Sequence, residues 1–488
     1  MSPLGAMQLA VALPAAASLP IAVTGRFPNL REAVTLITAL AVLVLVGSEV
    51  PGVLAGDRPE ITLIEFLPGL ALLFRLEPLG MIFALVASFL WLVTSIYSIG
   101  YMRGHHEQNQ TRFYVCFAIS IASALGVAFA GNMLTLFTAY EVLSISTYPL
   151  VTHAGTEEAR RAGRVYLGIL LGTSIGFQLL AILWTWNITG SLDFREGGLL
   201  AGQIDGPAAA VLLALYVFGI GKAAVMPFHR WLPAAMVAPT PVSALLHAVA
   251  VVKSGVFAIL KVCVYLFGLD FLTSTGASDW LLYFAGATIL VGSLVAMRKD
   301  NLKARLAYST ISQLSYIVAG ALLASSLAAT GAAMHIAMHA FGKITLFFCA
   351  GAILVAAHKT EISQMDGLGR AMPLTFAAFF IGSLSIIGLP PTGGTWSKFY
   401  LAMGALEAGQ FWMLIVLMVS SVLNIVYLLP IPIRAFLARP AEDVPDKVKE
   451  APLPCLIAIG VTSLGCLVLF FYPDLLYQLA RLVGAGAG

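Results

Sequence analysis

Charged residues are scarce in this chain. Asp, Glu, Lys and Arg make up only 10% of its 488 residues, whereas 59% are hydrophobic. Soluble globular domains carry about 25% charged residues, so the composition excludes an ordinary soluble enzyme. Apolar stretches of about 18 or more residues recur from end to end, and each can cross roughly 30 Å of hydrocarbon as a helix. The sequence therefore predicts an all-α polytopic membrane protein.

Cofactor motifs are also lacking. The five cysteines form no Cys-x-x-Cys pair, which argues against disulfides, iron–sulfur clusters and structural zinc. There is no phosphate loop, no dinucleotide fingerprint and no haem-attachment motif. We therefore expect no cofactor, no bound metal and no nucleic-acid partner. The chain is expected to be a transport protein rather than an enzyme that catalyses a bond-forming reaction.

About fourteen membrane spans are predicted. The first lacks the basic segment that precedes the apolar core of a signal peptide, so we interpret it as a helix. The loop from Asp57 to Glu77 contains an apolar patch that is either re-entrant or strand-like. The expected spans are Met7–Gly25, Ala33–Val50, Pro78–Gly100, Phe113–Ala130, Asn132–Val151, Val165–Trp186, Ala208–Met226, Thr240–Phe267, Trp280–Met297, Leu306–Ala324, Ala332–Ala357, Leu374–Leu406, Phe411–Leu437 and Leu456–Tyr472.

Lysine and arginine are distributed unevenly between alternate loops. Cytoplasmic loops retain an excess of these residues. With the N-terminus outside, the inner loops hold eighteen of the 27 basic residues, including Arg31 and Lys447, and the outer loops hold four. The other five are lysines within spans. The distribution predicts a multi-pass protein of the cell inner membrane, with its N-terminus and C-terminus on the outer, periplasmic side.

Two spans are interrupted by proline and glycine, and both carry a lysine. The stretch from Gly219 to Pro241, GIGKAAVMPFHRWLPAAMVAPTP, contains Lys222, and GLPPTGGTWSKFY, which begins at Gly388, contains Lys398. A lysine at the bilayer centre costs about 2.5–3.5 kcal/mol on insertion scales, and prolines free backbone groups that need new partners. Paired interruptions indicate repeats with a site at the midplane. Because the two lie five spans apart, the repeat would be inverted.

Glu141 is the only carboxylate predicted near the middle of a span. Ionisable residues within membranes are functional by default. A contact between Glu141 and Lys222 that forms and breaks would switch the protonation of the lysine, because pairing favours the charged forms whereas burial favours the neutral ones. The alternative is a static ion pair that fixes helix packing.

Two further lysines occupy the next span. Lys253 lies in mid-span with no acid on its own helix, and we interpret it as a group that accepts a proton and passes it on. The alternative is a structural role in which Lys253 binds carbonyl groups of a helix break. Lys261 lies two turns further along and is expected to snorkel to the membrane interface.

His335, His339 and Lys343 are spaced i, i+4 and i+8, which places them on one helical face. Two histidines at this spacing can bind a metal, but no third ligand occurs at a recognisable spacing. Because histidine titrates near neutral pH, a stripe that relays protons is the better interpretation. The alternative is a pair of histidines bonded across helices. The hydroxyl-rich stretch from Tyr308 to Tyr316 either holds helices together or lines a file of waters.

Five stretches resemble a known family. They are YEVLSISTYPL, GKAAVMPFHRWLPAAMVAPTPVSALLHA, LKARLAYSTISQLSYI, MHAFGKITLFFCAG and GLPPTGGTWSK. They are similar to the proton-conducting antiporter-like subunits shared by Mrp-type cation/proton antiporters, membrane-bound hydrogenases and respiratory complex I. The resemblance covers about Tyr97 to Leu437. DGLGRAMP and SSVLNIVYLLPIPIRAF look most similar to the D-type subunits of Mrp antiporters.

This resemblance implies a fold of about fourteen helices with two inverted five-helix repeats, residues 111–268 and 279–438, flanked by helices in residues 1–110 and 453–488. It implies that the chain is the proton-translocating subunit of a multi-subunit Mrp-type Na⁺ or K⁺/proton antiporter, with other membrane subunits as partners. One alternative is a proton-pumping subunit of a redox complex, of the NADH:quinone oxidoreductase or hydrogenase type. Another is a self-sufficient transporter of an organic solute. The implied proton pathway comprises Glu141, Lys222, Lys253, His335, His339, Lys343 and Lys398.

Overall fold

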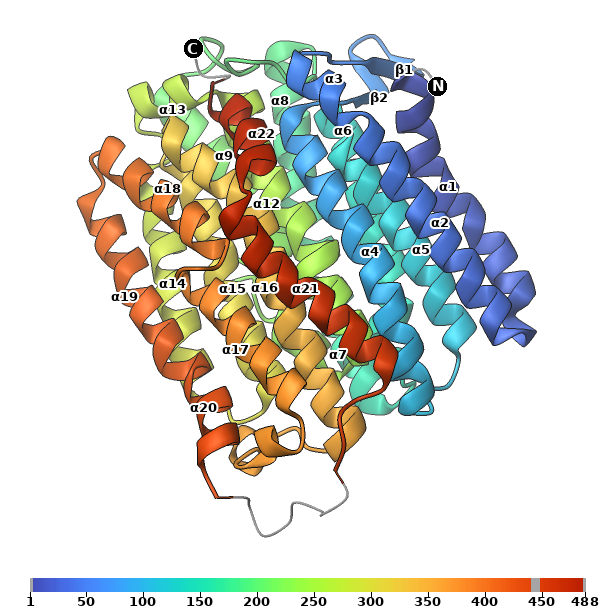
Figure 1. Cartoon of the computed structure of the whole chain (residues 1–488). Coiled ribbons are helices and arrows are strands. Elements are labelled where there is room, and N and C mark those ends of the chain that lie inside the picture. Colours follow the sequence, from blue (N-terminus) through green and yellow to red (C-terminus); the bar gives the residue numbers. More distant parts are fainter. Residues whose placement is uncertain (1–2, 440–447, 486–488) are drawn as a thin grey trace.

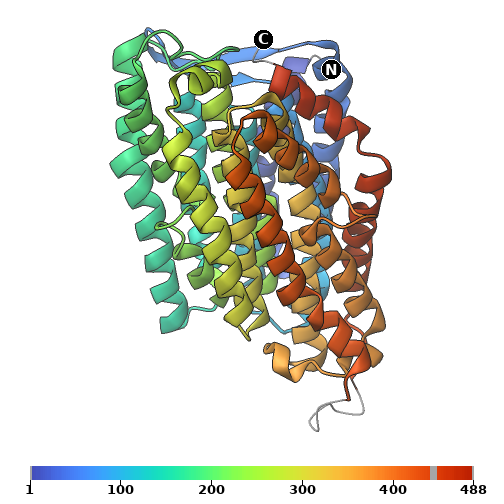
Figure 2. The same cartoon turned by 90° about the vertical axis from the view of Figure 1, so that its left-hand side faces the viewer.

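The helices of the protein lie side by side in one bundle (Figures 1 and 2). The computed structural model describes residues 3–439 and 448–485, so the predicted inner-loop residue Lys447 lies outside the described residues. The first helix, α1 (Pro3–Val23), begins at the end of the bundle where the last helix, α22 (Asp474–Ala485), lies (Figure 1). The two ends of the described chain are therefore on one side. Which side of the membrane this is stays a prediction.

Helices account for nearly all of the regular structure. Up to the middle of the chain the elements are α2 (Pro28–Ser48), α3 (Val50–Ala55), β1 (Glu60–Leu67), β2 (Leu70–Arg75), α4 (Pro78–Gly104), α5 (Gln110–Ala128), α6 (Met133–Val151), α7 (Glu157–Thr173), α8 (Leu179–Thr189), α9 (Gly206–Gly219), α10 (Trp231–Ala234), α11 (Thr240–Ala244) and α12 (Val251–Lys261). The remaining helices before α22 are α13 (Leu269–Thr275), α14 (Asp279–Arg298), α15 (Leu302–Leu322), α16 (Ser326–Ala357), α17 (Pro373–Ile387), α18 (Gly394–Glu407), α19 (Phe411–Leu428), α20 (Pro430–Leu437) and α21 (Leu453–Phe471).

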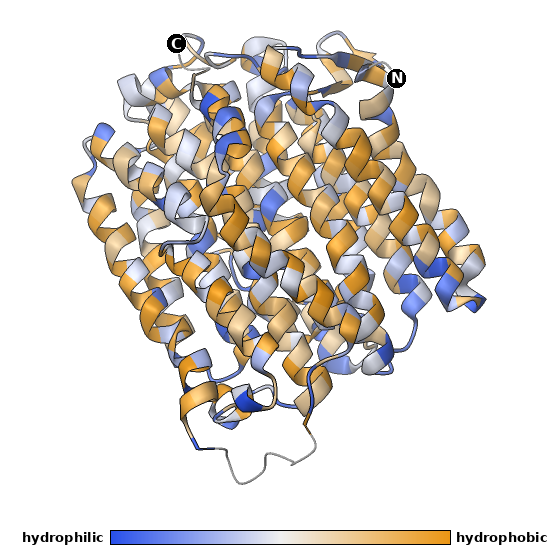
Figure 3. Ribbon diagram, viewed as in Figure 1, coloured by the Kyte–Doolittle hydropathy of each residue, from blue (hydrophilic) through white to orange (hydrophobic). Residues whose placement is uncertain are grey.

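Three π-helical segments adjoin these helices. Ser174–Gln178 joins α7 to α8, Leu245–Val249 joins α11 to α12, and Val262–Phe267 continues α12. Among the described residues, ten helical segments are long and apolar enough to cross a membrane, and the shorter helices α9 and α17 are also apolar. Hydrophilic residues gather mainly at the two ends of the bundle (Figure 3). These features confirm an all-α polytopic membrane protein, whereas the count of fourteen spans stays a prediction.

The apolar patch after Asp57 forms an antiparallel hairpin, which confirms the strand-like interpretation. Strands β1 and β2 pair from Glu60 opposite Arg75 to Leu67 opposite Leu70. Gly69 at the turn has a φ of 80°, and a Cβ there would lie 2.2 Å from the backbone oxygen of Gly190. The turn therefore requires glycine both for its conformation and for its close approach to the end of α8.

The centre of the bundle is formed by the α11–α12 segment and by α16. The apolar window of Thr240–Phe267 is entirely buried, and α16 packs against α15, α17, α18, α21 and α22. Helix α22 was not predicted. It is short and amphipathic, with Leu476, Leu479 and Val483 buried against neighbours that include α4 and α16. Ionisable side chains of the two central helices are consequently shielded from lipid by other helices.

The prediction that Lys261 snorkels to the interface is wrong. Its side chain is fully buried, pairs with Glu77 and donates a hydrogen bond to the carbonyl oxygen of Ala130 at 2.5 Å. Glu77 precedes α4 and is itself 4% exposed. Glu77 lies between β2 and α4, and its pairing with Lys261 compensates the charge of the lysine within the protein.

The assignment of Arg31 to an inner loop is also wrong, because the residue lies within α2. Helix α2 begins earlier than expected, and Arg31 is 3% exposed. Its guanidinium pairs with Glu32 at 3.2 Å and donates to the side chains of Gln110 and Thr111. Because Glu32 also pairs with Arg103, this charge cluster joins α2 to α4.

Candidate functional site

The first predicted helix interruption is confirmed. Helix α9 ends at Gly219, and Lys222 lies in a single 3₁₀ turn, Gly221–Ala223, before α10 begins at Trp231. The indole nitrogen of Trp231 donates to the carbonyl oxygen of Gly221 at 3.0 Å. This bond satisfies a backbone group that the broken helix leaves free, as a buried interruption requires.

Lys222 is held by helix α6. Its Nζ donates to the carbonyl oxygen of Tyr140 at 2.7 Å and to Oγ of Ser144 at 2.6 Å, and it lies 3.0 Å from the centroid of the Tyr140 ring. The backbone N–H of Lys222 donates to the Tyr140 hydroxyl at 3.0 Å. The side chain is fully buried. Tyr140 and Ser144 are four residues apart on one face of α6, so a single helix face receives the lysine.

Glu141 makes no ion pair with Lys222 in this structure. Neither carboxylate oxygen has a hydrogen-bond partner among the described residues, although both atoms are buried. Glu141 follows Tyr140 and therefore points about 100° away from the face that holds Lys222. The two side chains are therefore unpaired in this structure, and a contact that forms and breaks stays a prediction.

The second predicted interruption is also confirmed. Helix α17 ends at Ile387, Gly388 has a φ of 88°, and α18 begins at Gly394. Nζ of Lys398 donates to the carbonyl oxygen of Ile387 at 3.0 Å and to Oγ of Ser421 at 3.2 Å. The lysine therefore binds a carbonyl group at the end of the preceding helix, where the backbone has no helical partner of its own.

A direct contact joins the two halves of the chain. Nζ of Lys253, on α12, lies 2.5 Å from Nδ1 of His339, on α16. His335 lies on the same face of α16, with Nδ1 2.8 Å from Oγ of Ser397 and Nε2 3.2 Å from Oε1 of Gln313. Ser397 is the neighbour of Lys398 on α18. The buried side chains thus lead from the first half to the second interrupted helix.

Lys343 is the third residue of the face of α16 that the sequence predicted. All three residues of this face are buried, with His335 and His339 each 1% exposed and Lys343 fully enclosed. Nζ of Lys343 donates to Oγ of Ser309 on α15 at 2.7 Å. The hydroxyl-rich stretch of α15 therefore supplies direct partners to this face.

Lys222 and Lys253 are connected only by the packing of the elements that carry them. Helix α12 lies against the first interruption at Gly255, where a Cβ would lie 2.3 Å from the backbone nitrogen of Ala223. His247, earlier in the same central segment, has no hydrogen-bond partner for either ring nitrogen among the described residues. Lys222 and Lys253 are therefore on adjoining elements without a direct bond between their side chains.

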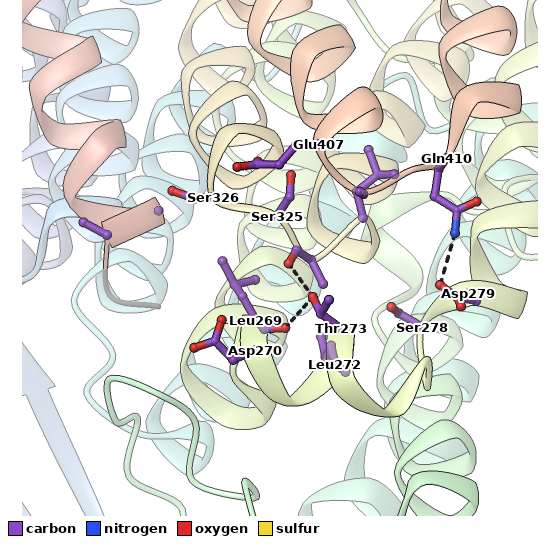
Figure 4. A pocket seen from close by; sticks show the side chains of 15 residues that line it. Leu269, Asp270, Leu272, Thr273, Ser278, Asp279, Ser325, Ser326, Glu407 and Gln410 are labelled. Carbon is purple, nitrogen blue, oxygen red and sulfur yellow. Dashed lines mark hydrogen bonds between the residues drawn. The ribbon is translucent and has the colours of Figure 1, made fainter. Parts of the chain in front are cut away.

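An acidic pocket lies at the end of the bundle that holds the chain ends. This cavity of about 530 Å³ is lined by Asp270, Asp279 and Glu407, with Thr273 and Ser278 beside them (Figure 4). Glu407 is the last residue of α18. It follows Lys398 by nine residues, or about 14 Å along the helix axis. The pocket thus lies at the C-terminal end of the helix that carries the second lysine.

Sequence reasoning missed four side chains that bind the lysines or their partners. Ser144 and Ser421 bind the lysines of the two interruptions, whereas Tyr427 and Asn424 extend the bonds of Lys343 through Ser309. The signal for Ser144 was present, because it lies four residues after Tyr140 in a polar span. Nothing local marks Tyr427, since its partner Ser309 is 118 residues away.

Comparisons with known proteins agree with this architecture. The transmembrane model described as NADH:quinone oxidoreductase/Mrp antiporter matches residues 130–424, and a model of the N-terminus of complex I chain 5 matches residues 69–114. The chain belongs to the NADH:quinone oxidoreductase/Mrp antiporter family of membrane subunits. The matched range includes both interruptions and all seven predicted pathway residues.

Individual relatives come from both branches of this family. NADH-quinone oxidoreductase subunit N of Desulforudis audaxviator is 33% identical over 82% of this chain and 82% of that protein. The probable A/B subunit of a K⁺/H⁺ antiporter of Rhizobium meliloti is 31% identical over 84% of this chain but only 41% of that protein. Chain 5 of the NAD(P)H-quinone oxidoreductase of Synechocystis is 32% identical over 67% of this chain and 49% of its own length.

Two solved structures share the fold. A chain of the Mrp complex from Dietzia has a TM-score of 0.89 at 23% identity, over 99% of this chain and 97% of that chain. A chain of the archaeal membrane-bound sulfane sulfur reductase has a TM-score of 0.88 at 23% identity, over 100% of this chain and 98% of that chain. The fold is therefore that of the antiporter-like subunits.

Proposed function

We propose that the chain is the proton-translocating subunit of a multi-subunit Mrp-type Na⁺ or K⁺/proton antiporter in the cell inner membrane. Protons move along a buried axis in the order Glu141 and Lys222, Lys253, then His339, His335 and Lys343, and finally Lys398. The subunit itself makes and breaks no covalent bond other than bonds to hydrogen. Other membrane subunits of the complex supply the driving event, so the isolated chain is inactive or leaky.

The contact between Lys253 and His339 carries this proposal. It joins α12 to α16 at 2.5 Å, in a part of the protein where both side chains are shielded from lipid and from bulk water. An amine and an imidazole at this distance can exchange a proton, because one donates while the other accepts. A purely structural pair of cations would be disfavoured in so apolar an environment.

The two halves have separate parts in this proposal. Residues 111–268 hold Glu141, Lys222 and Lys253, whereas residues 279–438 hold the α16 face and Lys398. We treat them as inverted repeats because each contains one interrupted helix with a buried lysine. The acidic pocket beyond Lys398 then serves as the outer mouth, since a cleft lined by one sign of charge concentrates cations.

Transport in membrane vesicles tests the proposal. In vesicles that contain the assembled complex, Lys222→Ala and Glu141→Ala are each expected to abolish cation-dependent proton transport, because each removes an ionisable group of the axis. Arg161→Gln, a change of an exposed arginine at the start of α7, is the control and should transport normally. Normal rates in either axis variant, with the complex assembled, would refute the pathway.

A redox complex is the second candidate. The match to NADH-quinone oxidoreductase subunit N, which covers 82% of both chains, favours it. The same axis would then be driven by electron transfer in partner subunits. Purification of the native complex distinguishes the two, because iron–sulfur centres with quinone-dependent proton transport support the redox complex, whereas exchange driven by Na⁺ or K⁺ alone supports the antiporter.

A further inference from the structure

A chain of hydrogen bonds leaves the axis at Lys343. Nζ of Lys343 donates to Oγ of Ser309, the Tyr427 hydroxyl lies 2.9 Å from that Oγ, and the same hydroxyl lies 2.5 Å from Oδ1 of Asn424. The four side chains come from α16, α15 and α19, and none is more than 1% exposed. We call these four residues the Lys343 branch.

The number of hydroxyl hydrogens limits the directions in which the hydrogen bonds of the Lys343 branch can run. A phenol hydroxyl has one hydrogen, so Tyr427 cannot donate to Ser309 and to Asn424 at once. When Lys343 is charged, it donates to Ser309, Ser309 donates to Tyr427, and Tyr427 donates to the amide oxygen of Asn424. When Lys343 is neutral, it can accept, and the two hydroxyl groups turn so that Tyr427 donates to Ser309 and Ser309 donates to the amine, while the Asn424 amide turns so that its NH₂ group donates to the Tyr427 oxygen. The branch therefore has one arrangement for each charge state of the lysine.

The far end of the branch carries an unsatisfied donor. Nδ2 of Asn424 has no hydrogen-bond partner among the described residues, although the side chain is fully buried. Buried amide groups are nearly always satisfied by protein or by ordered water. Asn424 consequently suits a water-binding role next to the Tyr427 hydroxyl.

The branch leads towards the end of the bundle opposite the hairpin. Tyr427 is in the last turn of α19, directly before α20, which lies at that end (Figure 1). The carbonyl oxygen of Tyr427 accepts a hydrogen bond from the guanidinium of Arg305 at 3.0 Å, and Arg305 is partly exposed near the start of α15. Through its own backbone, Tyr427 therefore connects the buried hydroxyl chain to a side chain that reaches the surface.

We propose that the Lys343 branch is a second proton entry, which loads Lys343 from the end of the bundle opposite the chain ends. This inference rests on the proposed function and adds an entry that Glu141 and Lys222 do not provide. A hydronium ion beside Asn424 gives a proton to the Tyr427 oxygen, Tyr427 gives its hydrogen to Ser309, and Ser309 gives its hydrogen to neutral Lys343. One O–H bond breaks for each O–H or N–H bond that forms, and the net result moves one proton from water to the lysine.

The Tyr427→Phe variant tests the entry directly. It removes the hydroxyl and keeps the ring, so the branch is interrupted with little change in packing. Proton transport by the assembled complex in vesicles is expected to fall about tenfold rather than to vanish, because the route through Lys253 and His339 remains. Tyr216→Phe is the matched control. That tyrosine is also buried and also bonds a hydroxyl, on Thr185, but lies outside the axis, so its transport rate should not change.

The pH profile separates a proton entry from a packing role. Asn424→Asp places a titratable carboxyl at the outer end of the branch, so the pH profile of transport should shift, whereas Asn424→Leu should lower the rate at every pH. Equal behaviour of the two variants, with an unchanged profile, would overturn the proposal. Lys343→Gln identifies which hypothesis fails. If Lys343→Gln is inactive while Tyr427→Phe transports normally, the branch alone is wrong, and if Lys343→Gln transports normally, the proposed axis is wrong.

Discussion

The two interrupted helices hold their lysines in different ways. Lys222 lies inside the first interruption and binds groups of a separate helix, α6. Lys398 lies beyond the second interruption, on α18, and reaches back to a carbonyl group of α17, the other part of the same span. A movement of α6 can therefore change both side-chain hydrogen bonds of Lys222, whereas one of the two hydrogen bonds of Lys398 lies within its own interrupted span and the other reaches Ser421 on α19.

The residues beside the two lysines sharpen this contrast. Each Nζ lies near a tyrosine ring, Tyr140 at 3.0 Å in the first half and Tyr316 at 4.7 Å in the second. The residue that follows Tyr140 is Glu141, whereas the residue that follows Tyr316 is the apolar Ile317. In the first half a carboxylate therefore follows the tyrosine that contacts the lysine, whereas in the second half an apolar residue does. We therefore propose that the first half controls transport and that the second half releases protons.

Glycine packing at the first interruption gives the largest expected effect. Gly255 brings α12 against the first interruption, and a Cβ there would lie 2.3 Å from the nitrogen of Ala223, which is backbone and cannot move aside. Gly255→Ala should therefore separate α12 from the interruption and strongly reduce both transport and thermal stability. Gly172→Ala, where no atom lies within 4 Å of the added Cβ, is the control. Unchanged transport in Gly255→Ala would show that this contact does not matter.

A smaller difference is expected between the two serines that bind the lysines. Oγ of Ser144 lies 2.6 Å from Nζ of Lys222 and is buried, whereas Oγ of Ser421 lies 3.2 Å from Nζ of Lys398 on a partly exposed residue. Removing a hydrogen bond to a buried amine costs about 1.5 kcal/mol, or roughly tenfold in rate. Ser144→Ala should therefore slow proton transport about tenfold and Ser421→Ala by less. The reverse order, measured in the same vesicles, would contradict the assignment of control to the first half.

Sequence reasoning found the features that have local signals. The interruptions at Lys222 and Lys398 were predicted because proline, glycine and a lysine occur together in apolar runs, and the face of His335, His339 and Lys343 follows from helical spacing. The hairpin after Asp57 was left open between two alternatives, because a short apolar run has no decisive period.

Partners that are distant in the sequence could not be predicted. Lys261 was expected at the interface, since nothing near it indicates that Glu77 is folded against it. Asn424 and Tyr427 bind through Ser309, which belongs to a span that pattern analysis described only as hydroxyl-rich. Long-range pairing of polar groups depends on how helices pack, and periodicity within one helix carries no such information.

Proton transport by a Lys253→Met complex tests the central claim most directly. Methionine keeps an unbranched apolar chain of similar length but cannot carry a proton, so the contact with His339 that joins the halves is lost. In vesicles containing the assembled complex, the account predicts no cation-dependent proton transport above that of empty vesicles. Transport at the wild-type rate would contradict it, because protons would then pass between the halves without Lys253.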